Sequence, residues 1–275
     1  MKSRLVLGIL LTTLTVPATL SAQEEYARGP LGEAVLWRVA PTHAAAFEAA
    51  AAKIVTAAGQ AGLGEEYRWA IWQHGFEYGL YGPVPDMAAF DDPEAFMRQF
   101  KDTPGEATLM EAFQEFSSLE HEVLNREVWE AVPAWGYTPE QPYAEQTGYA
   151  SMYESWMKPG TDEKADAISK EWVAFLKEVG YGYAAAGYRV HFGDIGRLIF
   201  VTWYDNTADY YGANSFMKLV EEKAAGEKWG DLIKRWNELI SRYEESQWTY
   251  RADLSYWPSS SNWTRPQAAR EGGCS

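Results

Sequence analysis

The chain has 275 residues, of which 47% are hydrophobic and 23% are charged, and its formal net charge is −15. This hydrophobic content excludes a disordered chain, and the acidic balance excludes charge-driven binding to nucleic acid or to anionic lipid. The single cysteine, Cys274, excludes an intrachain disulfide and leaves open only pairing between chains.

Residues 1–22 have the pattern of a secretory signal peptide. Lys2 and Arg4 form a basic start, residues 5–14 are apolar, and residues 20–22 offer small side chains for cleavage. The apolar stretch is too short to span a membrane comfortably. We therefore expect a periplasmic or extracellular protein that is not inserted in the membrane after cleavage, with an uncleaved anchor as the alternative.

The next residues predict a first structural unit after a loose, polar segment at 23–33. Thr42 is a good helix N-cap, and Gly62 suits the left-handed stop of that helix. Pro93 lies at the start of a second helix, which Pro104 and Gly105 interrupt. The expected elements are, in order, a strand at 34–39, a helix at 42–62, strands at 67–74 and 80–84, a helix continuing to about residue 125, and a strand at 128–135.

A second unit follows a polar, Pro-containing linker at 138–148. Thr161 opens its first helix, and Asp162 and Glu163 favour the helix dipole there. The expected elements are a strand at 149–157, a helix at 161–180, strands at 183–191 and 197–204, a long helical region at 215–245, and a strand at 248–257. Residues 258–275 form a tail rich in Ser, Pro and Gly, which we expect to be flexible.

The two units share one order of landmarks, which indicates a duplication. Most pairs are 117 to 120 residues apart, and they are Pro41 and Pro159, Gly62 and Gly180, His74 and His191, and Phe96-Met97 and Phe216-Met217. Each unit, at 34–137 and at 149–257, has the order β-α-β-β-α-β of a ferredoxin-like fold. Such a sheet has one face covered by helices and one bare face. The predicted fold class is therefore α+β, with two tandem repeats packed through their sheets as a pseudo-dimeric barrel.

On this element order and these paired landmarks, the chain resembles the dimeric α+β barrel superfamily over about residues 34–257. That superfamily includes antibiotic-biosynthesis monooxygenase, EthD-like and NIPSNAP-like families. The resemblance implies activities that range from cofactor-free oxygenases to haem enzymes, and no catalytic signature of one family is matched. The fold therefore does not choose a function.

Two histidines are the strongest catalytic candidates, because each is expected at the end of a second strand, beside a turn. His74 and His191 could act there as base or proton shuttle. Arg189 shares a strand face with His191. The alternative is that each histidine is a structural residue at the end of a hairpin.

Aromatic residues on the expected strands indicate a pocket for a small hydrophobic or aromatic molecule. The candidates for ligand binding are Trp37, Trp72, Trp156, Tyr188 and Trp203, together with Glu154, which could pair with Arg189. The alternative is that these rings simply fill the space between two sheets.

Four functions compete on this basis. We predict a secreted protein that binds a small molecule, without a metal or other cofactor, as a monomer or a homo-oligomer. The alternatives are a cofactor-free monooxygenase or isomerase that uses His191 and Arg189, a haem enzyme with His191 as the ligand, and a non-enzymatic interaction protein. Measurements of oxygen uptake test the oxygenase, an absorption spectrum tests the haem enzyme, and ligand-binding measurements test the binding protein.

Overall fold

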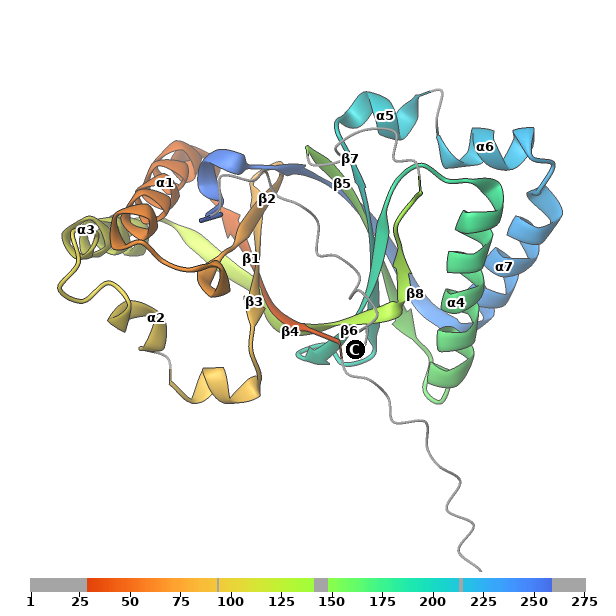
Figure 1. Cartoon of the computed structure of the whole chain (residues 1–275), viewed down its shortest axis with the longest axis horizontal. Helices are drawn as coiled ribbons and strands as arrows, with labels where there is room; N and C mark the ends of the chain where they lie inside the picture. Colours follow the sequence, from red (N-terminus) through yellow and green to blue (C-terminus); the bar gives the residue numbers. More distant parts are fainter. Residues whose placement is uncertain (1–28, 93, 141–147, 213–214, 259–275) are drawn as a thin grey trace, which may run out of the picture.

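Eight antiparallel strands form one closed barrel in the computed structural model, which describes residues 29–92, 94–140, 148–212 and 215–258 (Figure 1). The expected signal peptide, residues 23–28 of the segment expected to be loose, most of the linker and all of the tail except Pro258 lie outside these residues. The remainder of that segment is described, and its last three residues begin β1. The strands are β1 (Leu31–Val39), β2 (Ala70–His74), β3 (Glu77–Val84), β4 (His121–Tyr137), β5 (Tyr149–Met157), β6 (Ala185–Phe192), β7 (Arg197–Tyr204) and β8 (Ile240–Tyr250).

The barrel consists of two copies of one four-stranded sheet. The first half has the order β4-β1-β3-β2 and the second half the order β8-β5-β7-β6. The halves join where β2 pairs with β8 and where β4 pairs with β6. The predicted fold, two ferredoxin-like repeats that cover each other's bare sheets, is therefore confirmed.

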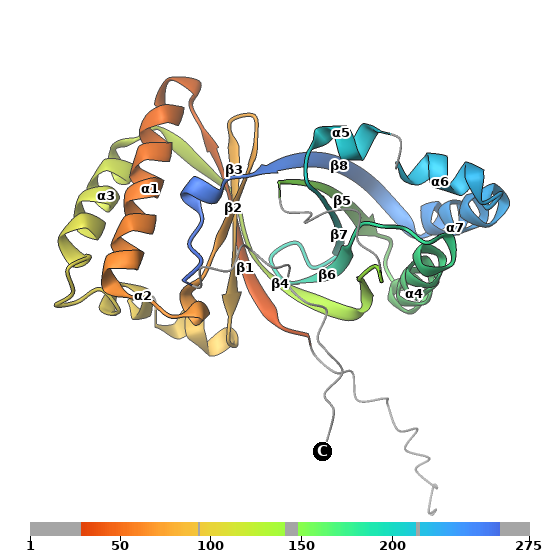
Figure 2. The same cartoon turned by 45° about the horizontal axis from the view of Figure 1, so that its top comes forward.

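The helices lie outside the barrel, in one layer for each half (Figures 1 and 2). They are α1 (Ala44–Ala61), α2 (Ala95–Arg98), α3 (Glu106–Ser118), α4 (Asp162–Val179), α5 (Thr207–Tyr211), α6 (Phe216–Glu222) and α7 (Gly226–Leu239). The long helices α1 and α4 both end at a glycine in the left-handed region, Gly62 with φ 67° and Gly180 with φ 69°. This equivalence supports the predicted duplication, because only glycine adopts that conformation without a steric cost.

Two expected helices were predicted to be too long. The helix expected to reach about residue 125 ends at Ser118, and β4 begins at His121. The helical region expected at 215–245 ends at Leu239, and β8 begins at Ile240. Both strands start with charged residues on both faces, so they lack the apolar alternation that normally identifies a strand.

Side chains alternate between the helix-facing outside and the inside of the barrel. Buried clusters under the helices take up the outward residues of the two halves. A third buried cluster, which includes Ala70, Ala150, Tyr188, Ile199 and Trp203, occupies the inside of the barrel. The core therefore has three parts, and the inner one belongs to both halves.

Candidate functional site inside the barrel

Aromatic rings line part of the inner surface of the barrel. Tyr81, Trp129 and Tyr188 come from three different strands, and their ring centroids lie 5.8–5.9 Å apart. Trp72 contacts Tyr250 across the β2–β8 seam, with centroids 5.1 Å apart. Burial raises the pKa of the Tyr81 and Tyr188 hydroxyls well above the ordinary range, so both stay neutral at physiological pH.

Solvent reaches the middle of this surface. Met152 lies mid-strand on β5, opposite Val201 of β7 and Ser246 of β8, and it packs against the inner cluster. The strands β7 and β8 are hydrogen-bonded to β5 on its two sides. Met152 is nevertheless only half-buried, and so are the inward residues Ser246 and Trp72. Because these side chains face inward, the solvent that they contact lies within the barrel. The interior is therefore not completely filled by side chains.

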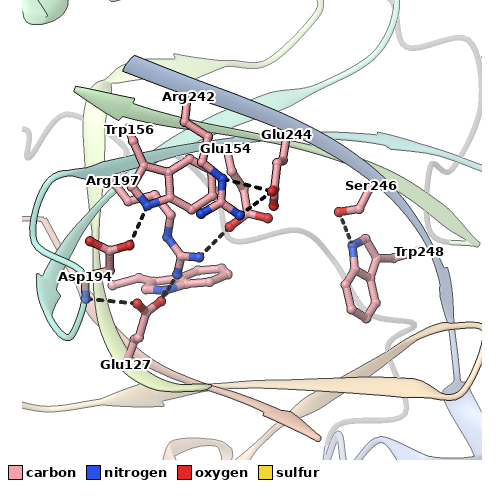
Figure 3. A network of polar contacts seen from close by, with 10 residues as sticks. Glu127, Glu154, Trp156, Asp194, Arg197, Arg242, Glu244, Ser246 and Trp248 are labelled. Carbon is pink, nitrogen blue, oxygen red and sulfur yellow. Dashed lines mark hydrogen bonds and ion pairs between the residues drawn. The ribbon is translucent and has the colours of Figure 1, made fainter. Parts of the chain in front are cut away.

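An ion triplet stands on the same inner surface (Figure 3). The Arg197 guanidinium of β7 binds Glu127 of β4 through Nη2 and Glu154 of β5 through Nη1, the second contact being 2.6 Å long. Arg197 is 8% exposed and Glu127 is 1% exposed. Removing such charges from water is costly unless each is paired, which explains why the three residues occur together.

The two carboxylates of the triplet differ in how many donors they bind. Glu127 accepts from Arg197, from Trp129 Nε1 at 2.9 Å and from the backbone N–H of Asp194 at 3.1 Å. Glu154 accepts from Arg197 through Oε1. Glu127 therefore ties β4 to the β6–β7 hairpin, whereas Glu154 keeps more of its acceptor capacity for another group.

The surroundings of Glu154 favour its neutral form. Burial raises its pKa above the usual value for a glutamate, and Arg197 opposes this shift only in part. Glu244 and Glu127 add to the increase, while Arg242 reduces it. A carboxyl group of raised pKa beside an arginine is typical of sites that hold ligands or move protons, although ion pairs of purely structural role also show such shifts.

A stack of charged and aromatic groups covers the triplet. The Trp156 ring lies 5.5 Å from Arg197 Cζ and 4.1 Å from Arg242 Cζ, both measured to the ring centroid. Trp156 donates through Nε1 to Asp194 of the β6–β7 hairpin, and Arg242 binds Glu244. Arg197 Nε is buried and has no acceptor among the described residues. Positively and negatively charged side chains thus meet at one end of the inner surface.

The structure brings most of the predicted ligand-binding residues into the barrel. Trp72, Tyr188 and Trp203 belong to the inner cluster, and Glu154 and Trp156 belong to the ion network. Trp37 lies outside, because it packs against Phe47 and Phe116 under α1 and α3. Trp37 faces the helices since Ala34, three residues earlier on β1, faces the other side.

Arg189 and His191 also lie on the helix-facing side. Arg189 is paired with Leu198, a residue of the outer core, and its guanidinium lies 4.7 Å from the Trp135 ring centroid. Its partner is Asp166 of α4, at 3.5 Å. The expected pair between Arg189 and Glu154 is therefore wrong: the two residues face opposite sides of the sheet, and Glu154 binds Arg197 instead.

The two histidines are not equivalent, contrary to the expectation from the repeat. His74 pairs with Glu77 on the face of Trp72, and its Nδ1 lies 2.7 Å from the carbonyl oxygen of Gln247. His191 is on the face of Arg189, with Nδ1 3.5 Å from Glu130 Oε2. A difference of one residue in register places a side chain on the other face of a sheet, and the sequence landmarks missed that difference.

The space at Gly187, on the strand face of Arg189, is filled by aromatic side chains. A Cβ atom added to Gly187 would lie 2.6 Å from Trp135 Cβ and 3.0 Å from Phe200. Gly187 thus accommodates aromatic rings of the outer core. The haem alternative with His191 as the ligand stays a prediction.

Sequence reasoning missed several polar residues of the site: Glu127, Arg197, Arg242, Glu244 and Ser246. Glu127, Arg242 and Glu244 lie in or beside segments that were expected to be helical, where charged residues indicate a solvated face. The signal that could have identified Arg242, Glu244, Ser246 and Trp248 is their spacing of two residues, which is the period of a strand.

The described residues contain neither a cluster that could bind a metal ion nor a helix that could span a membrane. No group of three His, Cys, Asp or Glu side chains could hold a metal ion in that part of the chain. Among the same residues, no helix has both the length and the apolar character that crossing a membrane requires.

The comparisons with known proteins concern the fold. No protein-family model and no curated protein matches the chain. An anthrone oxidase-like protein of known structure is 13% identical, with a TM-score of 0.50, and the match covers 81% of this chain and 91% of that one. A candidate monooxygenase from Fusobacterium nucleatum is 11% identical, with a TM-score of 0.50 and coverage of 82% and 93%. One from Lactobacillus acidophilus is 10% identical, with a TM-score of 0.48 and coverage of 83% and 96%.

These similarities extend over nearly the full length of the matched structures, and the closed barrel is the architecture that the paired landmarks predicted. At such low identity they show a shared fold and leave the chemistry open. The chain therefore has the dimeric α+β barrel fold of the superfamily that it resembles, with both ferredoxin-like halves in one polypeptide.

Proposed function

We propose that the barrel interior binds a small hydrophobic or aromatic molecule. The observation that supports this function is the inner surface itself, where aromatic rings surround mid-strand side chains that remain half-buried. Binding sites for small molecules combine such apolar walls with a few polar groups that fix orientation. Here the polar groups are those of the Glu127–Arg197–Glu154 triplet.

The proposed binding site is tested by filling the barrel interior with a larger side chain. Met152→Trp adds an indole to the inner surface, whereas Met110→Trp adds one to an exposed position on α3 that is 53% exposed in the native chain. Binding of naphthalene derivatives is measured by calorimetry. We expect Met152→Trp to weaken binding at least about tenfold and Met110→Trp to leave it unchanged. Binding that is unaffected by Met152→Trp, or absent from the native protein, would contradict an interior site.

A cofactor-free monooxygenase or isomerase is the second candidate, and the descriptions of structural neighbours favour it. Oxygen uptake with activated phenols or quinols tests this activity. Loss of uptake in His191→Ala and Arg189→Ala would assign the reaction to the outer face, whereas loss in Glu154→Gln alone would assign it to the barrel. The same purified protein should show no Soret band, and a strong one would favour the haem alternative.

Export from the cytoplasm is a separate part of the proposal, and the signal-like pattern at residues 1–22 supports it. Determination of the N-terminal residue of the protein recovered from the periplasm or the medium is the measurement. A mature chain that begins close to residue 23 is expected, and an intact Met1 in the cytoplasmic fraction would contradict export.

A further inference from the structure

The charges on the inner surface do not balance, and this imbalance indicates what the ligand carries. The buried triplet contains two carboxylates and one guanidinium. The neighbouring Arg242 and Glu244 form a pair of their own, so they do not change the sum. With every group ionised, the buried triplet therefore has one uncompensated negative charge inside the barrel, where water screens it poorly. Asp194, Arg242 and Glu244 lie at exposed positions beside it.

Glu154 is where this charge is accessible. Glu127 is fully enclosed by three donors, whereas Glu154 is held by Arg197 and keeps a side chain that is 12% exposed. Glu154 lies opposite Ile199 on β7 and opposite Glu244 on β8. Two residues away from Glu154 on β5 and from Glu244 on β8 are Met152 and Ser246, the half-buried centre of the inner surface.

Aromatic rings stand beside this position. Along β8 the inward residues after Glu244 are Ser246 and Trp248, and Trp248 lies within reach of Gly79 on the first half, since a Cβ there would be 3.6 Å from its ring. Figure 3 shows Trp248 apart from the charged network on the same strand as Arg242 and Glu244. Rings attract cations through their faces, so a carboxylate and aromatic walls favour the same kind of group.

We propose that the ligand is an aromatic molecule with a positively charged amine, and that the Glu154 carboxylate binds this amine. This inference rests on the proposed function of the barrel interior. An ammonium group would supply the missing positive charge and donate to the free acceptor positions of Glu154. Its ring would lie over Met152 toward Trp248, in the half-buried part of the surface.

The binding should depend on pH, because the amine requires an ionised Glu154. Burial raises the pKa of Glu154, and the charged groups that face it are Arg197 from β7, Arg242 and Glu244 from β8, and Glu127 from β4. Affinity for the amine should therefore rise as pH rises through this raised pKa. The affinity for a neutral ligand should show no such increase.

The experiment compares three probes that share a naphthalene ring and differ in charge: 1-naphthylmethylamine, its neutral N-acetyl derivative and anionic 1-naphthoate. Calorimetry at neutral pH and low salt should give the amine about tenfold higher affinity than the neutral probe, and the anion the lowest. Glu154→Gln should abolish this preference and flatten the pH profile, while Glu154→Asp, which keeps the charge, should retain part of it.

The matched control is Glu33→Gln. Glu33 is also a strand glutamate bound to an arginine, Arg126, at 2.6 Å, but it lies next to the inward Ala34 and so faces outward. This variant should bind all three probes as the native protein does. Equal binding of amine and neutral probe, or an amine preference that survives in a folded Glu154→Gln variant, would overturn the inference and leave the binding function intact. Failure of every probe to bind would remove both.

Discussion

The two halves of the barrel share a backbone but differ in what they present to its interior. On β1, Leu36 lies opposite Gly79 and Asn125. On β5, the equivalent strand of the second half, Glu154 lies opposite Ile199 and Glu244. The charged network comes from the second half, except for Glu127 at the β4–β6 seam. Duplication thus supplied a symmetric frame, and the candidate site depends on residues that only one copy has.

The acidic residues of the halves also differ in their electrostatics. Glu48 of α1 is bound by Arg251 and by the Tyr78 hydroxyl on the outside of the first half, and hydrogen bonding to Arg251 lowers its pKa. Burial raises the pKa of Glu154 inside the second half. Glu48 therefore stabilises the fold through its charge, whereas the charge of Glu154 is costly until a ligand compensates it.

The largest expected effect comes from removing the central cation of the network. Arg197→Met would leave Glu127 and Glu154 buried without their partner, which should lower the free energy of unfolding by about 3–5 kcal/mol. In the first half, Arg38 also binds a glutamate, Glu77, but its side chain is 58% exposed. Arg38→Met should cause no measurable loss. Urea unfolding of both variants makes the comparison, and similar losses would show that the network does not stabilise the barrel.

A smaller effect should separate the packed outer layer from the open interior. Gly187→Ala places a methyl group against Trp135, and overpacking of this kind should cost about 1–3 kcal/mol. At Gly79 the nearest atom to an added Cβ is 3.6 Å away, on Trp248. Gly79→Ala should therefore be tolerated. Thermal unfolding measures both, and destabilisation by Gly79→Ala equal to that by Gly187→Ala would contradict an accessible interior.

The smallest effects are changes in the free energy of unfolding with pH, and these changes should have opposite signs for Glu48 in the first half and Glu154 in the second. Relative to Glu48→Gln, the native protein should gain stability as pH rises through the lowered pKa of Glu48, up to the unfolded value of about 4.3. Relative to Glu154→Gln, it should lose stability as pH rises from about 4.3 through the raised pKa of Glu154. Unfolding curves at several pH values test this, and parallel slopes for the two variants would refute the contrast.

Much of the fold could be predicted from the sequence, because the repeated landmarks are local. Gly62 and Gly180 end equivalent helices, and the element order of each half follows from such stops. The barrel then follows from the bare faces of two ferredoxin-like sheets. The strands β4 and β8 were partly missed, because their charged beginnings have no apolar face to indicate a strand.

The same property explains why the site was predicted only in part. Trp72, Trp156, Tyr188 and Trp203 were found because aromatic residues on strands stand out. Glu127, Arg242 and Glu244 have charged side chains that normally face water. Only the register of neighbouring strands assigns them to the inner face, where Glu127 is buried and the other two stay largely exposed. The different faces of His74 and His191 have a related cause: a shift of one residue between the repeats is invisible in the landmarks but reverses the face.

The closed ring of strands also determines how this protein behaves with other copies of itself. In a single half, β2 and β4 would be outer strands with unpaired backbone N–H and C=O groups, which act as templates for association with other chains. In the complete chain, β8 and β6 take up these groups. Cleavage between the halves should therefore give fragments that recombine or aggregate, because each fragment would expose the backbone groups that β8 and β6 pair in the intact chain.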